Sequence, residues 1–211
     1  MIGRSPARPY KLLSVLLRYP DERLAAAHDE VAAAVAELPR RAPEKAPLER
    51  FLRHLLATPP RRLAEEYVET FDLRRRSGLY LGWYLHGDTR KRGLALLRLK
   101  RLYAAAGLEP TAAELPDYLP LVLEFAALAP EGAGELVLRQ HRPALELLRA
   151  RLHELESPYA CLLDAVCAGL PRLSPVERER VRRLAAEGPP TEQVGLEPFA
   201  PPEVMPAEAR R

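Results

Sequence analysis

The chain has 211 residues, of which 47% are hydrophobic and 29% are charged, and this composition excludes wholesale disorder and a collagen-like fibre. A formal net charge of only +3 disfavours a nucleic-acid-binding protein. No apolar run reaches the roughly 18 residues of a membrane span and the N-terminus lacks a signal-peptide cleavage site, so we expect a cytoplasmic protein without direct membrane insertion.

The apolar residues predict an all-helical fold. Leu and Ala dominate, whereas there are only eleven Val, five Thr and one Ile, so residues that favour a pleated sheet are scarce. The 22 prolines fall mostly where helices should begin or end. We therefore expect an all-α, single-domain bundle of roughly eight to ten helices over residues 1–187, followed over 188–211 by a Pro-rich, acidic and disordered tail.

Proline and glycine separate the expected helices of the first half. These helices span about residues 9–19, 21–38, 48–57 and 58–71, with a polar loop over 39–47. Asp21 is expected to cap the second helix. A polar break at 74–78 precedes a short apolar stretch over 79–86.

The second half begins with the longest expected helix. Asp88 is expected to cap it and Gly107 to end it. Thr111 and Glu114 have capping-box spacing, but the next helix is expected to start only at about Asp117, after a proline. The remaining helices are expected over about 132–140, 143–156, 158–170 and, after a second capping box at 174–177, over 175–187.

Catalytic and metal-binding motifs are missing from the sequence. It contains no Gly-rich phosphate loop, no His pair at i, i+4, no Cys-x-x-Cys and no nucleophile elbow, so an enzyme is disfavoured and neither a cofactor nor a metal site is expected. The two cysteines, Cys161 and Cys167, would lie on different faces of one helix as buried small hydrophobes. A helical cofactor-binding enzyme or cofactor carrier stays open as an alternative, because Arg90 and Arg92 could hold an anionic pterin phosphate.

Aromatic residues concentrate in one segment of a chain that is only 6% aromatic. Five of them fall within 18 residues: Tyr67, Phe71, Tyr80, Trp83 and Tyr84. Aromatic side chains with polar tips suit a wall that contacts another chain, and they equally suit a core where two helices cross. Both interpretations stay open from the sequence alone.

Several motifs carry a resemblance to a known family. They are Tyr-Val-Glu-Thr-Phe-Asp at 67–72, Leu-Tyr-Leu at 79–81, Tyr-Leu-His-Gly-Asp-Thr-Arg at 84–90, Arg-Gly-Leu-Ala-Leu-Leu-Arg at 92–98, Glu-Leu-Pro-Asp at 114–117 and Val-Leu-Glu-Phe-Ala at 122–126. Together they resemble the nitrate reductase molybdenum cofactor assembly chaperones, the NarJ type or delta subunit within the redox-enzyme maturation chaperones. The resemblance extends from the first helix to about residue 170.

The resemblance implies an all-helical, non-enzymatic cytoplasmic chaperone. Its implied partner is the catalytic (alpha) subunit of a respiratory nitrate reductase, bound before membrane assembly and kept competent for molybdenum cofactor insertion. Molybdenum cofactor delivery proteins are a further implied partner, and a maturation chaperone for another molybdoenzyme is the alternative. The N-terminal peptide of the client is expected to resemble a remnant twin-arginine leader, with basic residues and an apolar helical stretch.

Such a client predicts an apolar groove with acids near its rim. We assign to the groove Tyr67, Phe71, Leu79, Tyr80, Trp83, Tyr84 and Leu85. The candidate acids are Asp72, Asp88, Glu114, Asp117 and Glu124, with helix capping as the alternative role for Asp88 and Asp117. His86 and Arg90 of the most specific motif complete the set together with Pro116 and Tyr118, where Tyr118 stands in place of the family's usual His.

Overall fold

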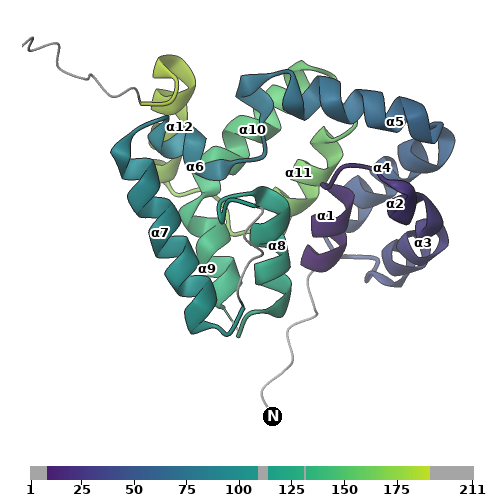
Figure 1. Ribbon diagram of the computed structural model, residues 1–211. Helices are drawn as coiled ribbons and strands as arrows, with labels where there is room; N and C mark the ends of the chain where they lie inside the picture. Colours follow the sequence, from purple (N-terminus) through teal and green to yellow (C-terminus); the bar gives the residue numbers. More distant parts are fainter. Residues whose placement is uncertain (1–8, 109–113, 131, 191–211) are drawn as a thin grey trace, which may run out of the picture.

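The computed structural model describes residues 9–108, 114–130 and 132–190, and in these ranges the protein is all-α with no named strand (Figure 1). The helices are α1 Tyr10–Leu16, α2 Glu22–Ala26, α3 His28–Glu37, α4 Lys45–Ala57, α5 Pro60–Tyr67, α6 Leu81–His86, α7 Arg90–Ala105, α8 Leu119–Leu128, α9 Ala133–Gln140, α10 Arg142–Glu154, α11 Ala160–Ala168 and α12 Pro175–Glu187. A π-helical turn, η1 Val68–Asp72, extends α5, and a 3₁₀ turn, η2 Arg75–Ser77, follows it. The expected disordered tail lies almost wholly outside the described residues, as does Thr111 of the first expected capping box.

Several predicted helix boundaries are confirmed at their capping residues. Asp21 accepts hydrogen bonds from the backbone N–H groups of the second and third residues after it, both at 3.1 Å. Gly107 follows α7 with φ +72°, the left-handed conformation that favours glycine. The Ser174 side chain accepts from the Glu177 N–H while Glu177 accepts from the Ser174 N–H, which completes the predicted capping box.

The predicted single helix over 21–38 was wrong, because the chain breaks it at Ala27 into α2 and α3. The run of alanines there contains neither proline nor glycine to signal the break. The loop predicted over 39–47 is also shorter than expected, since α4 begins at Lys45 and takes Pro47 into its first turn, where proline is tolerated. Lys45 Nζ donates to the carbonyls of Ala36 and Leu38 at 2.8 and 2.7 Å, and so ties α4 to the end of α3.

The predicted cap of α7 at Asp88 was wrong. Thr89 is the N-cap residue, and its hydroxyl donates to the His86 carbonyl at 2.8 Å. Instead, the Asp88 carboxylate forms an ion pair with Arg92, which lies four residues later, with Oδ1 and Nη1 3.5 Å apart. The next helix, predicted to start at about Asp117, begins two residues later, where α8 starts at Leu119.

The core joins helices that are far apart in the sequence as well as consecutive ones. α1 packs on α8, α11 packs on α4 and α10, and α12 packs on α10. Ser14 is fully buried in the first of these contacts, and its hydroxyl donates to the Pro120 carbonyl at 2.7 Å. α8 and α9 approach each other so closely that a Cβ on Gly134 would lie 2.1 Å from Ala126 Cα, which explains the glycine.

α10 and α11 are joined by a buried polar group. Arg142 pairs with Glu146 at 2.6 Å, and its Nη1 donates to the carbonyl of Cys167 at 3.0 Å. Cys167 is buried, which confirms the expected packing of that thiol and raises its pKa to about 12. Cys161 is only half-buried.

Helices α7 and α2, α3 and α5 lie at opposite sides of the molecule. In Figure 1, α7 forms one edge of the ribbon, whereas α2, α3 and α5 lie at the opposite side. Among the described residues, no helix has the length and apolar character needed to cross a bilayer.

Candidate functional site

A cleft of about 750 Å³ lies between the end of α1, the C-terminal end of α7 and α8. One side of α8 lines it with Leu121, Phe125 and Leu128, which share a helix face at i, i+4 and i+7. Leu128 is 58% exposed there. The other lining residues are Arg18, Tyr19, Asp21, Tyr103, Gly107, Leu108, Glu114, Tyr118 and Glu124. The cleft therefore combines an apolar wall with charged groups from three separate segments.

Glu124 is the acidic residue that α8 contributes to the cleft. Lys11 Nζ donates to one carboxylate oxygen of Glu124, and Arg18 Nη2 donates to the other at 2.5 Å. The hydrogen bond from Lys11, followed by the charges of both cations, lowers the pKa of Glu124 although partial burial opposes the shift. Glu124 is therefore ionised at neutral pH and already paired within the chain.

The two motif-bearing segments of the sequence meet beside the cleft. Tyr80 and Tyr118 form an isolated antiparallel bridge, with ring centroids 5.4 Å apart, and the Leu119 N–H donates to the Leu79 carbonyl at 2.8 Å. The Tyr80 hydroxyl donates to Glu114 at 3.3 Å. Burial, followed by the Glu114 carboxylate, raises the pKa of Tyr80 to about 12. The fold thus brings three predicted site residues, Tyr80, Glu114 and Tyr118, into one contact.

Tyr118 also joins the cleft to the core. Its hydroxyl lies 3.2 Å from the Tyr67 hydroxyl, which in turn donates to the Leu17 carbonyl at 3.3 Å. Because the Tyr67 hydroxyl has one proton, this arrangement requires Tyr118 to donate to Tyr67. Burial is the main cause that raises the pKa of both phenols, so both stay protonated.

Asp117 acts as a cap, but for a helix distant in the sequence. Its side chain is 1% exposed, and Oδ2 accepts from the Gly82 N–H at 3.0 Å at the start of α6. The same oxygen lies 3.5 Å from Arg92 Nη2, so the carboxylate links α6 to α7. A Cβ on Gly82 would lie 2.6 Å from this oxygen, which explains the glycine. Asp117 is not among the residues that line the cleft.

Residues 25–164 match the family model of the nitrate reductase delta subunit. The chain belongs to this family. It is 38% identical over 161 residues to the probable nitrate reductase molybdenum cofactor assembly chaperone NarJ of Bacillus subtilis strain 168, which covers 76% of this chain and 87% of that protein.

Two other relatives are longer than the matched region. The nitrate reductase molybdenum cofactor assembly chaperone NarJ of Escherichia coli K12 is 39% identical over 154 residues, which cover 72% of this chain and 65% of the relative. The nitrate reductase-like protein NarX of Mycobacterium tuberculosis H37Rv is 37% identical over 158 residues, which cover 75% of this chain but only 24% of the relative. The match to NarX therefore concerns about a quarter of that protein.

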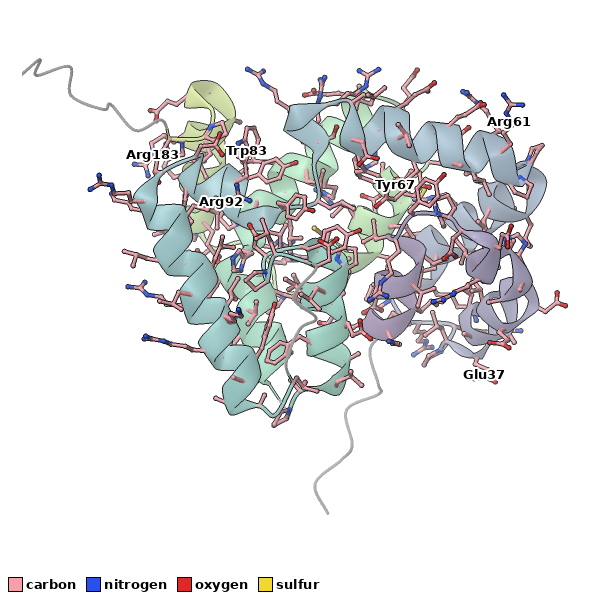
Figure 2. The ribbon with its side chains drawn as sticks, in the orientation of Figure 1. Glu37, Arg61, Tyr67, Trp83, Arg92 and Arg183 are labelled. Atoms are coloured by element: carbon pink, nitrogen blue, oxygen red, sulfur yellow. The ribbon has the colours of Figure 1, made fainter. Side chains whose placement is uncertain are left out.

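In the structure, most of the predicted aromatic groove lies in the core. Five of its seven assigned residues are at most 7% exposed: Tyr67, Phe71, Leu79, Tyr84 and Leu85. Tyr67 and Phe71 pack edge-on against Tyr159, with ring centroids 5.9 and 5.0 Å away (Figure 2 labels Tyr67 inside the ribbon). The sequence left open whether these aromatic residues form a wall for another chain or a core where helices cross. The five buried residues lie in such a core, and their contact with a client stays a prediction.

Trp83 and Tyr84 border a second cavity of about 260 Å³ between α6, α10 and α12. Figure 2 labels Trp83 and Arg92 near the place where α6, α7 and α12 meet. Tyr84 donates through its hydroxyl to the Gly78 carbonyl at 2.9 Å. This cavity holds none of the predicted acids.

The other predicted residues lie outside the main cleft. Asp72, Asp88 and Arg90 are exposed, and His86 is half-buried with a pKa lowered chiefly by burial. Pro116 is buried, and its carbonyl accepts from the Tyr103 hydroxyl at 2.8 Å. Of the sixteen predicted residues, the cleft gathers only Glu114, Tyr118 and Glu124.

Sequence reasoning missed the apolar wall on α8. The helix reads Leu-Pro-Leu-Val-Leu-Glu-Phe-Ala-Ala-Leu and is apolar on nearly every side, so packing must cover it all round. Leu128 at the end of this helix is left 58% exposed, whereas Phe125 on the same face is buried. The apolar character of this helix on nearly every side was the sequence signal that could have indicated the wall. Within the described residues, no group of three or more His, Cys, Asp or Glu is arranged to hold a metal ion.

Proposed function

We propose that this protein is a system-specific chaperone for a respiratory nitrate reductase. It binds the catalytic subunit of that enzyme, including its N-terminal segment, and keeps it competent for molybdenum cofactor insertion and membrane assembly. Membership of the delta subunit family, with relatives named as assembly chaperones, supports the class of function. The observation that carries the binding mode is the cleft of about 750 Å³ beside α8.

The cleft suits an amphipathic helix better than an extended strand. Leu121 and Leu128 offer apolar contact two turns apart on α8, above the buried Phe125, and no sheet edge is present among the described residues for strand addition. A client helix would bury its own apolar side chains against this wall. Burial of apolar area then supplies most of the affinity.

Charged groups around the wall would orient the client. Asp21 and Glu114 both line the cleft and are exposed. Asp21 caps α2 and Glu114 accepts from the Tyr80 hydroxyl, but neither pairs with a cation among the described residues, so both can meet basic residues of a leader-like peptide. Glu124 is held by Lys11 and Arg18, so a client cation would have to replace one of them to reach it. We therefore propose that Asp21 and Glu114, rather than Glu124, orient the client and speed its association with the cleft.

We further propose that the protein acts without catalysis, in the cytoplasm, on the client before membrane assembly. Its partners on this proposal are the client and proteins that deliver the molybdenum cofactor. The protein's own part is to hold a partly assembled subunit, for which the cleft supplies a surface and no reacting group is needed.

Calorimetry with a synthetic peptide of the client's first 15 or so residues tests the proposal. The expected result is binding with a negative heat-capacity change, because apolar surface is buried. Leu128→Asp should weaken binding by about ten-fold or more, since it places a charge on the apolar wall. Leu136→Asp on α9 is the matched control, because Leu136 is similarly exposed, at 52%, but does not line the cleft.

Two results would contradict the proposal in different ways. Equal affinity in the Leu128 and Leu136 variants would place the client elsewhere on the chaperone. Tight binding of the leader of another molybdoenzyme, with none for the nitrate reductase peptide, would keep the binding mode and change the client.

A further inference from the structure

The outer face of α7 has no covering element among the described residues. α7 is the longest helix, with 16 residues, yet only Leu99 and Tyr103 are buried. Leu94 and Leu97 are 58% and 45% exposed. The exposed residues that share this outward face at helical spacing, called here the α7 stripe, are Arg90, Lys91, Leu94, Leu97, Arg98 and Arg101.

The α7 stripe is strongly basic. The helix contains six basic residues and no acidic one: Arg90, Lys91, Arg92, Arg98, Lys100 and Arg101. Arg92 pairs with Asp88 and Asp117 beside the stripe, but no ion pair joins Lys91, Arg98 or Arg101 to another residue in the described ranges. Cations in a first helical turn also oppose the helix dipole, so an anion near this end would be stabilising.

The chain itself places an acidic segment beside this face. After α12, the backbone of Pro190 comes against Gly87, so closely that a Cβ on Gly87 would lie 1.8 Å from the Pro190 carbonyl oxygen. Gly87 has φ +57° and precedes α7 by only three residues. Residues 191–211 therefore start near the N-terminal end of the α7 stripe.

The length and charge of residues 191–211 match the stripe. Residues 191–209 contain four glutamates and no basic residue: Glu192, Glu197, Glu203 and Glu208. Ten extended residues span about 33 Å, whereas a 16-residue helix is about 24 Å long. Apolar Leu196 and Phe199 lie among the glutamates, as Leu94 and Leu97 lie among the cations of α7.

We propose that residues 191–209 of this chain cover the α7 stripe, with carboxylates beside its cations and apolar residues over Leu94 and Leu97. The contact is intramolecular and largely electrostatic, so it needs no regular structure in the Pro-rich segment. It gives the basic helix a counter-charge from the same chain. This inference does not depend on the cleft beside α8 or on its client.

Zero-length carbodiimide cross-linking of the full chain, read by mass spectrometry, tests the proposal. The chain has only four lysines, and two of them, Lys91 and Lys100, lie on α7. Lys45 serves as the internal control, because it begins α4 beside the end of α3, on another part of the molecule. Cross-links from the tail glutamates to the α7 lysines should exceed those to Lys45 by about ten-fold and fall several-fold between about 0.05 and 0.5 M salt.

Variants and isotope mixing make the test decisive. Arg98→Gln/Arg101→Gln should reduce cross-links to Lys91 several-fold, whereas Arg61→Gln should not change them, because Arg61 is on α5, away from α7 (Figure 2). Replacing the four tail glutamates by glutamine should shift the amide resonances of Leu94–Arg101. Unshifted α7 resonances, or equal cross-linking to Lys45, would overturn the proposal. Cross-links found only between ¹⁴N and ¹⁵N chains in a mixture would overturn it in favour of a second copy.

Discussion

Asp117 caps a helix distant in the chain, by accepting a hydrogen bond at 3.0 Å from the N–H of Gly82, which lies 35 residues before it. The same carboxylate oxygen lies 3.5 Å from Arg92, so one buried charge fixes the start of α6 and its position relative to α7. The two acidic residues of the motif at 114–117 therefore have different roles. Glu114 lines the cleft, whereas Asp117 holds the framework that supports it.

The first prediction concerns this carboxylate. Asp117→Asn keeps an acceptor for the Gly82 N–H but leaves Arg92 without its buried counter-charge, so we expect the free energy of unfolding to fall by about 1–2 kcal/mol. Asp117→Ala removes the acceptor as well, so we expect a fall of about 2–4 kcal/mol. Urea unfolding measures both. Asp88→Asn is the control, and it should cost less than about 0.5 kcal/mol because its partner contact is at the surface. An Asp117→Asn variant as stable as the parent would show that the charge is dispensable.

The second prediction compares two helical glycines. Gly82→Ala should destabilise by about 1–3 kcal/mol, because the new Cβ would come within 2.6 Å of Asp117 Oδ2. Gly93→Ala should instead stabilise by about 0.5–1 kcal/mol, since Gly93 is inside α7 and nothing lies within 4 Å of its added Cβ. Thermal unfolding of both variants gives the comparison. A stabilising Gly82→Ala would contradict the close approach of the carboxylate.

The fold class and most helices were predictable because leucine periodicity and proline positions are local signals. Asp21 and Ser174 were predicted as caps because each is adjacent to the helix it caps. Asp117 could not be assigned this way, since its cap partner Gly82 is brought near only by the tertiary fold. The aromatic segment shows the same limit, because composition does not reveal that Tyr159 covers Tyr67.

The third prediction concerns pH. Burial lowers the pKa of His141 and of His86 below the ordinary value of 6.5. The unfolded chain therefore binds protons at a higher pH than the folded chain does, so stability is complete above about pH 6.5 and falls as the pH drops through the lowered values. Unfolding measured between about pH 7.5 and 5.5 should show this decline.

A histidine variant separates this cause from general acid effects. His141→Gln can still donate to the Val137 carbonyl, which His141 Nδ1 approaches at 2.9 Å, but it cannot titrate. The decline should become shallower in His141→Gln and shallower again when His86→Gln is added. An unchanged slope in the double variant would assign the pH dependence to other groups.

The fourth prediction concerns the tail. Deleting residues 191–211 should change the melting temperature by less than about 2 °C, because exposed ion pairs contribute little to stability. Pro190 is kept, since its backbone packs against Gly87. A fall of many degrees would show that the segment contributes to the core, in conflict with the expected disordered tail.

The last prediction concerns the phenol of Tyr118. Tyr118 lines the cleft and donates to the Tyr67 hydroxyl at 3.2 Å, so Tyr118→Phe should lose about 0.5–1.5 kcal/mol of stability through the missing hydrogen bond. Tyr118→His places a titratable ring in the cleft beside Glu114. If the client binds there, its affinity should acquire a pH dependence between about pH 5 and 8 that the parent and Tyr118→Phe lack, because an imidazole changes charge in this range. Titration calorimetry at several pH values measures the effect, and identical pH profiles for all three proteins would place the client away from Tyr118.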